Sequence, residues 1–286
     1  MTNGVLLYAH NSRDIDYAQL SLISGGLAKK NLEVPVSLIT DESTVDWMKQ
    51  SKIYNKAVDI FDKIILQDRP ELTNYRNLRD LSAQHKVPFI NQTRSSAFKL
   101  SPYEKTLLID SDYFVLSNTL SEYWNINQSV IMPDAAKDIN YKDRMKYLDR
   151  YISETGIKMY WATAVMFTKN QEAKTFFELA DCVRENYETF ANLFRFCPLQ
   201  FRNDIAFSVA KHIMNGFEKP MEYTLPSLLT SLDRDSLDHV SDTKLNFLIE
   251  GDINGKYYPV SIKNCDIHIM NKKSITRNYE NLVNLI

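Results

Sequence analysis

Two aspartates, Asp110 and Asp112, directly follow the short apolar segment 106–109. Side chains two positions apart in an extended chain point to the same face, so both carboxylates can converge on one cation. Their oxygens suit the hard cations Mg²⁺ and Mn²⁺. Such an ion would bridge diphosphate oxygens and stabilise negative charge on a departing nucleoside diphosphate. Asp-x-Asp pairs also occur in ordinary turns, but the apolar strand before this pair and the lack of a second plausible site favour a metal.

Two later residues could complete such a site. His268 lies in an apolar segment, and a neutral imidazole is a better third ligand for Mn²⁺ than for Mg²⁺. Lys272 could neutralise a diphosphate as a point charge. Each residue also has a simpler interpretation, namely a histidine satisfied within the core and a lysine on the solvated surface, and these alternatives stay open.

The segments that must position these residues alternate between strand and helix patterns. Short apolar runs predict buried strands, and amphipathic stretches predict helices. The predicted strands are 4–9, 34–39, 63–66, 106–109, 130–132 and 162–167, and the predicted helices are 16–30, 45–51, 89–100, 173–190 and 204–213. This alternation indicates an α/β fold with a mostly parallel central sheet covered by helices. Ligands of such sheets bind beyond the carboxyl ends of the strands, which is where Asp110 and Asp112 fall.

Length and patterning predict one compact unit. The 286 residues suffice for two fused halves with a well-buried core. We expect residues 1–115 to form a nucleotide-binding half, and residues 116–286 to form a more irregular half on the acceptor side.

Composition excludes several classes of protein. A net charge of −2 excludes a strongly basic chain but allows a local basic patch. The three cysteines are widely spaced and match neither a disulfide framework nor a zinc site, which indicates a reducing compartment. Gly25 and Gly26 lie in a helical pattern, so they form neither a dinucleotide fingerprint nor a phosphate loop. No segment approaches the roughly 20 apolar residues needed to span a bilayer, and we expect a cytoplasmic protein.

The segment LLIDSDYFV (107–115) resembles the metal-binding strand end of GT-A-type glycosyltransferases, especially the retaining, glycogenin-like (family 8-like) group. Other matches follow in the same chain order over residues 5–272. They are YAHN (8–11), TD (40–41), Arg94, IMPDAA (131–136), WATAVMF (161–167), Asn203-Asp204 and DIHIMNK (266–272). The resemblance implies a GT-A-like fold, Mn²⁺ or Mg²⁺, and transfer of a hexosyl or pentosyl group from a nucleotide sugar, most simply a UDP-sugar, to an acceptor hydroxyl.

The resemblance also implies a role for each matching residue. Asp110, Asp112 and His268 would hold the metal. Asp134, Asn203 and Asp204 would orient the sugar, although a turn and a helix cap are simpler interpretations of these residues. The residues expected to contact the donor are Tyr8, Ala9, His10, Asn11, Asp41, Arg94, Ser111 and Lys272.

Two positions depart from the family's Asn-Ala-Gly-Val-Met-Val-Phe strand, because Trp161 replaces the Asn and Thr163 the Gly. Both lie where the sugar pocket should form. The chain is also similar to uncharacterised GT-A-like proteins of large bacteriophages, through NSRDIDY (11–17) and FRNDIAFSVAKHIMNGF (201–217). Some large phages glycosylate hydroxymethylated bases of their own DNA. The resemblance therefore implies modified DNA as an acceptor and the host cytoplasm as the location. The basic cluster 142–150 is either the lining of a DNA-binding groove or a solvated helix face.

Two rival functions use the same residues. A phosphatase with an aspartate nucleophile would place its Asp-x-Asp pair after the first strand, whereas several predicted strands precede Asp110 here. A non-catalytic nucleotide-sugar or nucleic-acid binding module would keep the sheet. It would have no need of the acidic pair, Asn203-Asp204 and His268 together.

Overall fold

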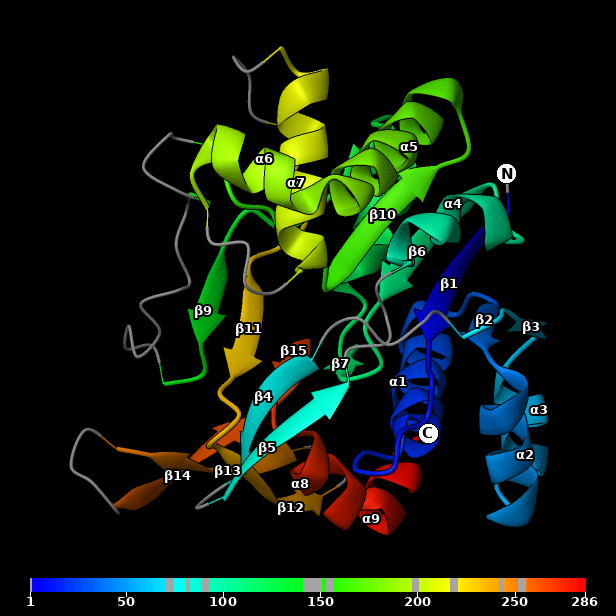
Figure 1. Cartoon of the computed structure of the whole chain (residues 1–286). Coiled ribbons are helices and arrows are strands. Elements are labelled where there is room, and N and C mark those ends of the chain that lie inside the picture. Colours follow the sequence, from blue (N-terminus) through cyan, green and yellow to red (C-terminus); the bar gives the residue numbers. More distant parts are fainter. Residues whose placement is uncertain are drawn as a thin grey trace.

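The computed structural model describes residues 2–69, 93–140, 151–152, 157–196, 201–216, 221–241, 244–251 and 256–286, together with the backbone of 75–80 and 83–88. Its centre is a six-stranded sheet in the order β3-β2-β1-β6-β10-β8 (Figure 1). The strands are β1 (Asn3–Tyr8), β2 (Val36–Thr40), β3 (Lys63–Leu66), β6 (Lys105–Ile109), β8 (Val130–Ile131) and β10 (Ala164–Thr168). All neighbours pair in parallel except β10, which is antiparallel to both β6 and β8. The predicted α/β class with a mostly parallel sheet is confirmed.

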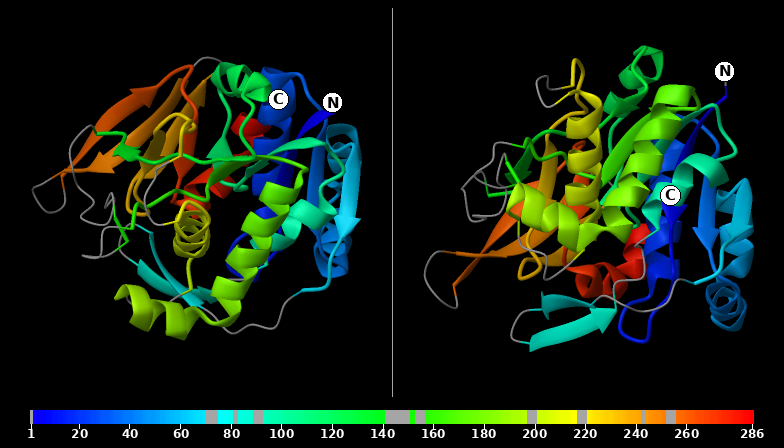
Figure 2. Two further views of the ribbon diagram at one scale, coloured as in Figure 1. Left: turned by 90° about the horizontal axis from the view of Figure 1, so that it is seen from above. Right: turned by 45° about the horizontal axis from the view of Figure 1, so that its top comes forward.

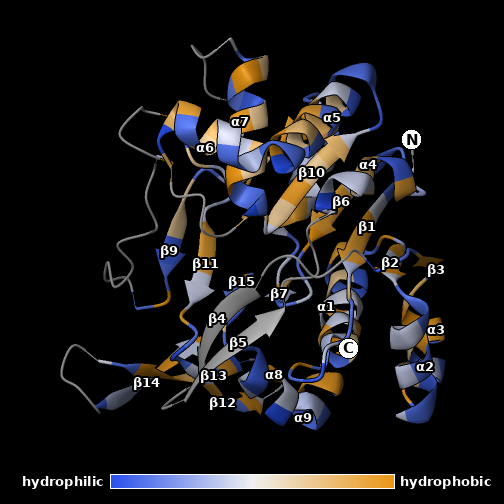
Figure 3. Cartoon of the chain, in the orientation of Figure 1, coloured by the Kyte–Doolittle hydropathy of each residue, from blue (hydrophilic) through white to orange (hydrophobic). Residues whose placement is uncertain are grey.

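Alternate residues of β1 face two different hydrophobic clusters. Val5 and Leu7 pack with residues of α1 (Tyr17–Leu32), while Leu6 and Tyr8 pack with residues of α5 (Gln171–Glu185) and α7 (Asn203–Met214). Successive side chains of a strand point to opposite faces, so a strand covered by helices on both sides must be apolar throughout. This explains the unbroken run at the start of the chain, and Figure 3 shows the same apolar character in β6 and β10.

Two smaller sheets contain most of the later strands. One has the order β7-β15-β11-β9 and consists of β7 (Tyr113–Phe114), β15 (Ile267–Ile269), β11 (Leu228–Ser231) and β9 (Ala136–Asp138). The other is an antiparallel meander of β12 (Ser236–Ser241), β13 (Lys244–Glu250) and β14 (Tyr257–Ile262). The views in Figures 1 and 2 place this meander on the opposite side of the molecule from α2 (Glu42–Gln50) and α3 (Tyr54–Ile60).

The remaining elements are short. They are a hairpin of β4 (Tyr75–Asp80) and β5 (Ala83–Pro88), the 3₁₀ segments η1 (Arg94–Ser96) and η2 (Thr119–Asn125), and the helices α4 (Ala97–Leu100), α6 (Tyr187–Phe194), α8 (Lys272–Arg277) and α9 (Tyr279–Val283). Among the described residues, none of the helices combines the length and the apolar character needed to span a membrane.

The six predicted strands all lie in the central sheet, with ends shifted by one or two residues. Two predicted helices differ from the structure. The stretch 173–190 is broken at Asn186, whose side-chain amide donates to the carbonyl of Cys182 at 2.9 Å and caps α5 before α6 begins. Of the stretch 89–100, residues 89–92 lie outside the described residues. The described part consists of η1 and α4 and not of one continuous helix.

The two adjacent glycines do lie inside a helix, as predicted. A Cβ atom on Gly25 would lie 2.6 Å from Cε1 of Phe61, and a Cβ on Gly26 would lie 2.7 Å from Cγ2 of Ile286. Both distances are too short for real contacts. These glycines therefore allow α1 to pack closely against Phe61, which follows α3, and against Ile286.

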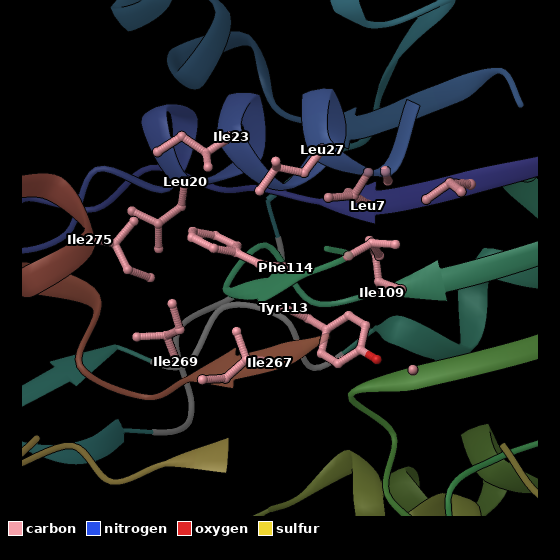
Figure 4. Packing of buried hydrophobic residues seen from close by; sticks show 14 of the residues in the cluster. Leu7, Leu20, Ile23, Leu27, Ile109, Tyr113, Phe114, Ile267, Ile269 and Ile275 are labelled. Carbon is pink, nitrogen blue, oxygen red and sulfur yellow. The ribbon is translucent and has the colours of Figure 1, made fainter. Parts of the chain in front are cut away.

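Phe114 connects the central sheet to the second sheet. It is fully buried in the same cluster as Leu20 of α1 and Ile269 of β15 (Figure 4).

We expect Phe114→Ala to lower the free energy of unfolding by about 3–5 kcal/mol, since it removes a buried ring and leaves a cavity. Urea unfolding followed by circular dichroism measures this. Leu193→Ala is the control because Leu193 is 65% exposed, and it should change stability by less than about 0.5 kcal/mol. Equal effects of the two variants would contradict this account.

Candidate metal and nucleotide site

The two aspartates lie in a tight turn at the carboxyl end of β6. The amide of Tyr113 donates to the carbonyl of Asp110 at 3.1 Å, which closes the turn. The amide of Asp110 donates to the carbonyl of Thr163 at 2.9 Å, beside the start of β10. The hydroxyl of Ser24, buried in α1, donates to the carbonyl of Tyr113 at 2.7 Å and fixes the turn from the helix side.

The short strand β15 brings His268 to the same turn. His268 lies opposite Tyr113 in the antiparallel pairing of β15 with β7, and the amide of Ile269 donates to the carbonyl of Asp112 at 2.9 Å. One potential ligand atom from each of Asp110, Asp112 and His268 lies within 4.8 Å of the others. Two carboxylates and one imidazole form a donor set that suits Mn²⁺, so the three residues fit a divalent cation.

Each of these carboxylates contacts one cationic side chain. The guanidinium of Arg94, which is only 1% exposed, pairs with Asp110, and its Nη2 also donates to the carbonyl of Thr163 at 3.4 Å. The ammonium of Lys272 pairs with Oδ2 of Asp112, and Nε2 of His268 lies 3.4 Å from that same oxygen. A metal ion bound to Asp112 would therefore compete with Lys272 for Oδ2.

The two carboxylates have opposite pKa shifts. Burial acts to raise the pKa of Asp112, but Lys272 and His268 outweigh it and hold the pKa well below its usual range. Burial likewise raises the pKa of Asp110, where Arg94 opposes the shift and the charges of Asp112 and Asp204 add to it, so the net change is upward. Asp112 is thus the carboxylate that stays ionised most easily.

A second network lies at the ends of β1 and β2. Nδ1 of His10 lies 2.8 Å from Oδ2 of Asp41, and Arg69 reaches the same oxygen at 3.0 Å. Arg69 also donates to the carbonyl of Asn11 at 2.8 Å. Burial acts to raise the pKa of Asp41, but its hydrogen bonds from His10, Ser43, Thr44 and Arg69 lower it well below its usual range. The structure therefore brings together His10, Asn11 and Asp41, which were all predicted for the donor site. It also places Arg69, which was not predicted, in contact with Asp41 and Asn11.

The other residues predicted at the end of β1 are partly engaged by the protein itself. The hydroxyl of Tyr8 lies 2.8 Å from Oγ of Ser96, and burial raises the pKa of Tyr8 above its usual range. The amide of Ala9 donates to the carbonyl of Ile39, and its carbonyl accepts from Thr40. The side-chain oxygen of Asn11 accepts from the first turn of α1, at the amide of Ala18.

The start of α7 brings a further carboxylate toward the metal ligands. Oδ1 of Asp204 accepts from the amide of Ala162 at 2.7 Å, and Oδ2 pairs with Arg202 at 2.8 Å. The Arg202 guanidinium lies 5.9 Å from the centre of the Trp161 ring. Asn203 is buried as the first residue of α7, and the cap position belongs to Arg202, so Asn203 is not the cap residue.

Asp134 belongs to a separate ion pair. Its Oδ2 lies 2.5 Å from Nζ of Lys158, in the segment that connects β8 to β9. Ser111 is buried in the turn between the two aspartates. The basic cluster 142–150 lies outside the described residues.

Each of the five aspartates predicted at the site is paired with one lysine or arginine. The pairs are Asp41–Arg69, Asp110–Arg94, Asp112–Lys272, Asp134–Lys158 and Asp204–Arg202. These ten side chains therefore carry no net formal charge, and a divalent cation would make the group positive, as a diphosphate requires. The sequence predicted Arg94 and Lys272 but missed the other three cations. Only Arg202, which directly precedes Asn203-Asp204, could have been found by its position.

No protein-family model matches the chain, and no curated protein matches its sequence. Solved structures do show similarity. The glycosyltransferase GlyE of Streptococcus pneumoniae TIGR4 is 12% identical with a TM-score of 0.41, over 81% of this chain and 45% of GlyE, so the chain spans less than half the length of that protein.

Two further similar structures are glycosyltransferases of nearer length. An active-site mutant of LgtC is 12% identical with a TM-score of 0.47, over 78% of this chain and 80% of LgtC. Mouse xyloside xylosyltransferase 1 is 12% identical with a TM-score of 0.42, over 76% of this chain and 83% of that one. Since these TM-scores lie below 0.5, the function proposed below depends on the geometry of the site.

The Lys272–Asp112 pair yields a prediction about metal affinity. We expect Lys272→Met to bind Mn²⁺ about tenfold more tightly than the wild type when no nucleotide is present, because hydrogen bonds to charged groups contribute about 1.5–3 kcal/mol. Electron paramagnetic resonance of free Mn²⁺ measures this. Lys99→Met makes the same charge change at an exposed residue and should leave the affinity unchanged. An unchanged or weaker affinity of Lys272→Met would show that Lys272 does not compete with the metal.

The lowered pKa of Asp41 predicts a dependence of stability on pH. A carboxyl whose pKa is lower in the folded state stabilises the fold above its unfolded pKa, and this contribution is lost as the pH falls below about 4. We therefore expect the free energy of unfolding to fall less steeply between about pH 5 and 2.5 in Asp41→Asn than in the wild type. Urea unfolding at several pH values measures both slopes, and parallel curves would contradict the prediction.

Proposed function

We propose that this chain is a metal-dependent glycosyltransferase that uses a nucleotide sugar, in the first instance a UDP-sugar. One observation carries the proposal: Asp110, Asp112 and His268 converge at the carboxyl end of a parallel strand, with Arg94 and Lys272 in contact with the carboxylates. Ligands of open α/β sheets bind at this edge. The site thus combines a place for a divalent cation with two further positive groups, as a diphosphate requires.

The reaction exchanges one bond for another at the anomeric carbon of the sugar. The bond from that carbon to the diphosphate oxygen breaks and a bond to the acceptor oxygen forms. The proton of the acceptor hydroxyl passes to the released diphosphate or to water. Bound Mn²⁺ or Mg²⁺ would stabilise the negative charge that develops on the departing nucleoside diphosphate. Lys272 would move from Asp112 to the diphosphate and add a second positive charge at the leaving group.

We propose that the other residues bind and orient the donor. The ends of β1 and β2, with Tyr8, His10 and Asp41, would hold the nucleoside within the half formed by residues 1–115. Asp204 would orient the sugar near the metal. Its charge acts on the pKa of Asp110, which supports a place for Asp204 close to the metal ligands. Trp161 and Arg202 would form the adjoining wall of the sugar pocket. The Trp161 ring and the Arg202 guanidinium would then take the place of the small polar surface that the resemblance implies.

The acceptor belongs to the half formed by residues 116–286. Hydroxymethylated bases of phage DNA are the first acceptor to test, because the resemblance to phage proteins implies them. Saccharide and protein hydroxyls are the alternatives. Asp134 would act on this side in its pair with Lys158.

Donor cleavage tests the proposal directly. The protein is incubated with a panel of nucleotide sugars and Mn²⁺, and release of the nucleoside diphosphate is followed without acceptor, with saccharides, with a protein acceptor and with DNA containing hydroxymethylcytosine. We expect release from one donor and stimulation by one acceptor. Asp112→Asn should reduce the rate by about 100-fold or more, since it weakens the group that stabilises the leaving charge.

Two controls make the result specific. Asp238→Asn makes the same substitution at an exposed residue of β12 and should retain full activity. Removal of the metal with a chelator should abolish release, and added Mn²⁺ should restore it. If the folded protein binds a nucleotide sugar but releases no diphosphate with any acceptor, it is a binding module and not an enzyme.

A further inference from the structure

The carboxylate of Asp266 closes the far end of the strand pair that carries two of the metal ligands. Its Oδ1 accepts three hydrogen bonds, from the amide of Leu116 at 2.8 Å, the amide of Ser117 at 2.9 Å and the hydroxyl of Ser117 at 3.0 Å. Asp266 precedes β15 directly, and Leu116 and Ser117 follow β7 after one intervening residue. One side-chain oxygen therefore joins two segments that are about 150 residues apart in the chain.

The metal ligands lie at the other end of this strand pair. The amide of Ile269 donates to the carbonyl of Asp112 at 2.9 Å, and His268 lies opposite Tyr113. The pairing thus runs from Asp112 at one end to the bonds of Asp266 at the other, with His268 between them. This arrangement holds Nε2 of His268 3.4 Å from Oδ2 of Asp112.

The strand pair supplies only part of the support for this position, and β15 also pairs with β11 on its other edge. β7 contains two residues and β15 contains three, so the ladder between them has few hydrogen bonds. The opposite edge of β7 is anchored to α1 through Ser24 and through Asn31, whose amide donates to the carbonyl of Val115 at 2.9 Å. These bonds hold β7, whereas β15 is held on its other edge by its pairing with Thr230 and Ser231 of β11. Asp266 is the side chain next to β15 that attaches this strand to the anchored segment.

We propose that Asp266 is a positioning residue that sets the place of His268 relative to Asp112 and so determines metal affinity. This inference rests on the proposed function, because it concerns the metal of the same site. Groups that orient metal ligands from outside the coordination sphere typically change affinity by 10–100-fold when removed. Asp266 acts through the backbone of β15 and contacts neither the metal ligands' side chains nor substrate in this role.

The test compares two substitutions by Mn²⁺ binding to the nucleotide-free protein, measured by isothermal titration calorimetry. Asp266→Ala removes all three bonds and should weaken Mn²⁺ binding by at least about tenfold. Asp266→Asn keeps an oxygen that can accept all three, since each bond ends on Oδ1, and it should retain most of the wild-type affinity. Loss of affinity in both variants to the same degree would assign the effect to charge and overturn the positioning role.

A matched control separates this role from general stability. Asp235 is a buried carboxylate that likewise accepts backbone amides, from Leu232 at 2.8 Å and Glu250 at 3.2 Å. Asp235→Ala should lower the thermal midpoint yet leave Mn²⁺ affinity unchanged. If Asp266→Ala fails to fold, Ser117→Ala removes one of the three bonds and should weaken Mn²⁺ binding in the same direction by less.

The remaining outcomes distinguish the inference from the proposed function. Wild-type affinity in the folded Asp266→Ala variant, or in Ser117→Ala where that variant replaces it, overturns the inference and leaves the metal-dependent transferase intact. Absence of Mn²⁺ binding by the wild type, with or without a nucleoside diphosphate, overturns both.

Discussion

The need to pair charges that are withdrawn from water governs the carboxyl edge of the central sheet. Asp112 is 4% exposed and Asp41 is 5% exposed, and an unpaired carboxylate at such a position destabilises a fold by several kcal/mol. The partners come from Arg69 after β3, Arg94 in η1, Arg202 before α7 and Lys272 in α8. Each of these elements must dock against the sheet before the charges can be satisfied, so the site and the fold stabilise each other.

The elements that could be predicted from the sequence are those with one dominant pattern. Apart from β3 at one edge, the strands of the central sheet are largely buried on both faces, and a continuous apolar run suits such a position. Asp110 and Asp112 could be singled out because they interrupt one of these runs abruptly. His268 was proposed as a third ligand through the resemblance, because a histidine in an apolar strand can equally be satisfied within the core, and the structure places it beside the aspartates.

The rest was hidden because its patterns are short or depend on distant partners. β13 of the meander does alternate, with Leu245, Phe247 and Ile249 buried. The strands of the β7-β15-β11-β9 sheet, in contrast, have only two to four residues. No periodicity can be recognised over such lengths. Arg69 and Lys158 resemble surface residues in sequence, and their roles as counter-ions appear only when the chain folds back on itself. Asp134 was predicted by resemblance to orient the sugar together with Asn203 and Asp204, and the structure shows it in an ion pair with Lys158 that the sequence did not indicate.

The contact between Lys272 and Asp112 joins residues 160 positions apart, and its consequence concerns the order of events during synthesis. A ribosome must translate about 160 residues beyond the acidic turn before either His268 or Lys272 can reach it. Until then, the two carboxylates at the end of β6 lack the contacts that His268 and Lys272 supply. A nascent chain that has not reached these residues therefore carries the acidic turn with two of its partners missing.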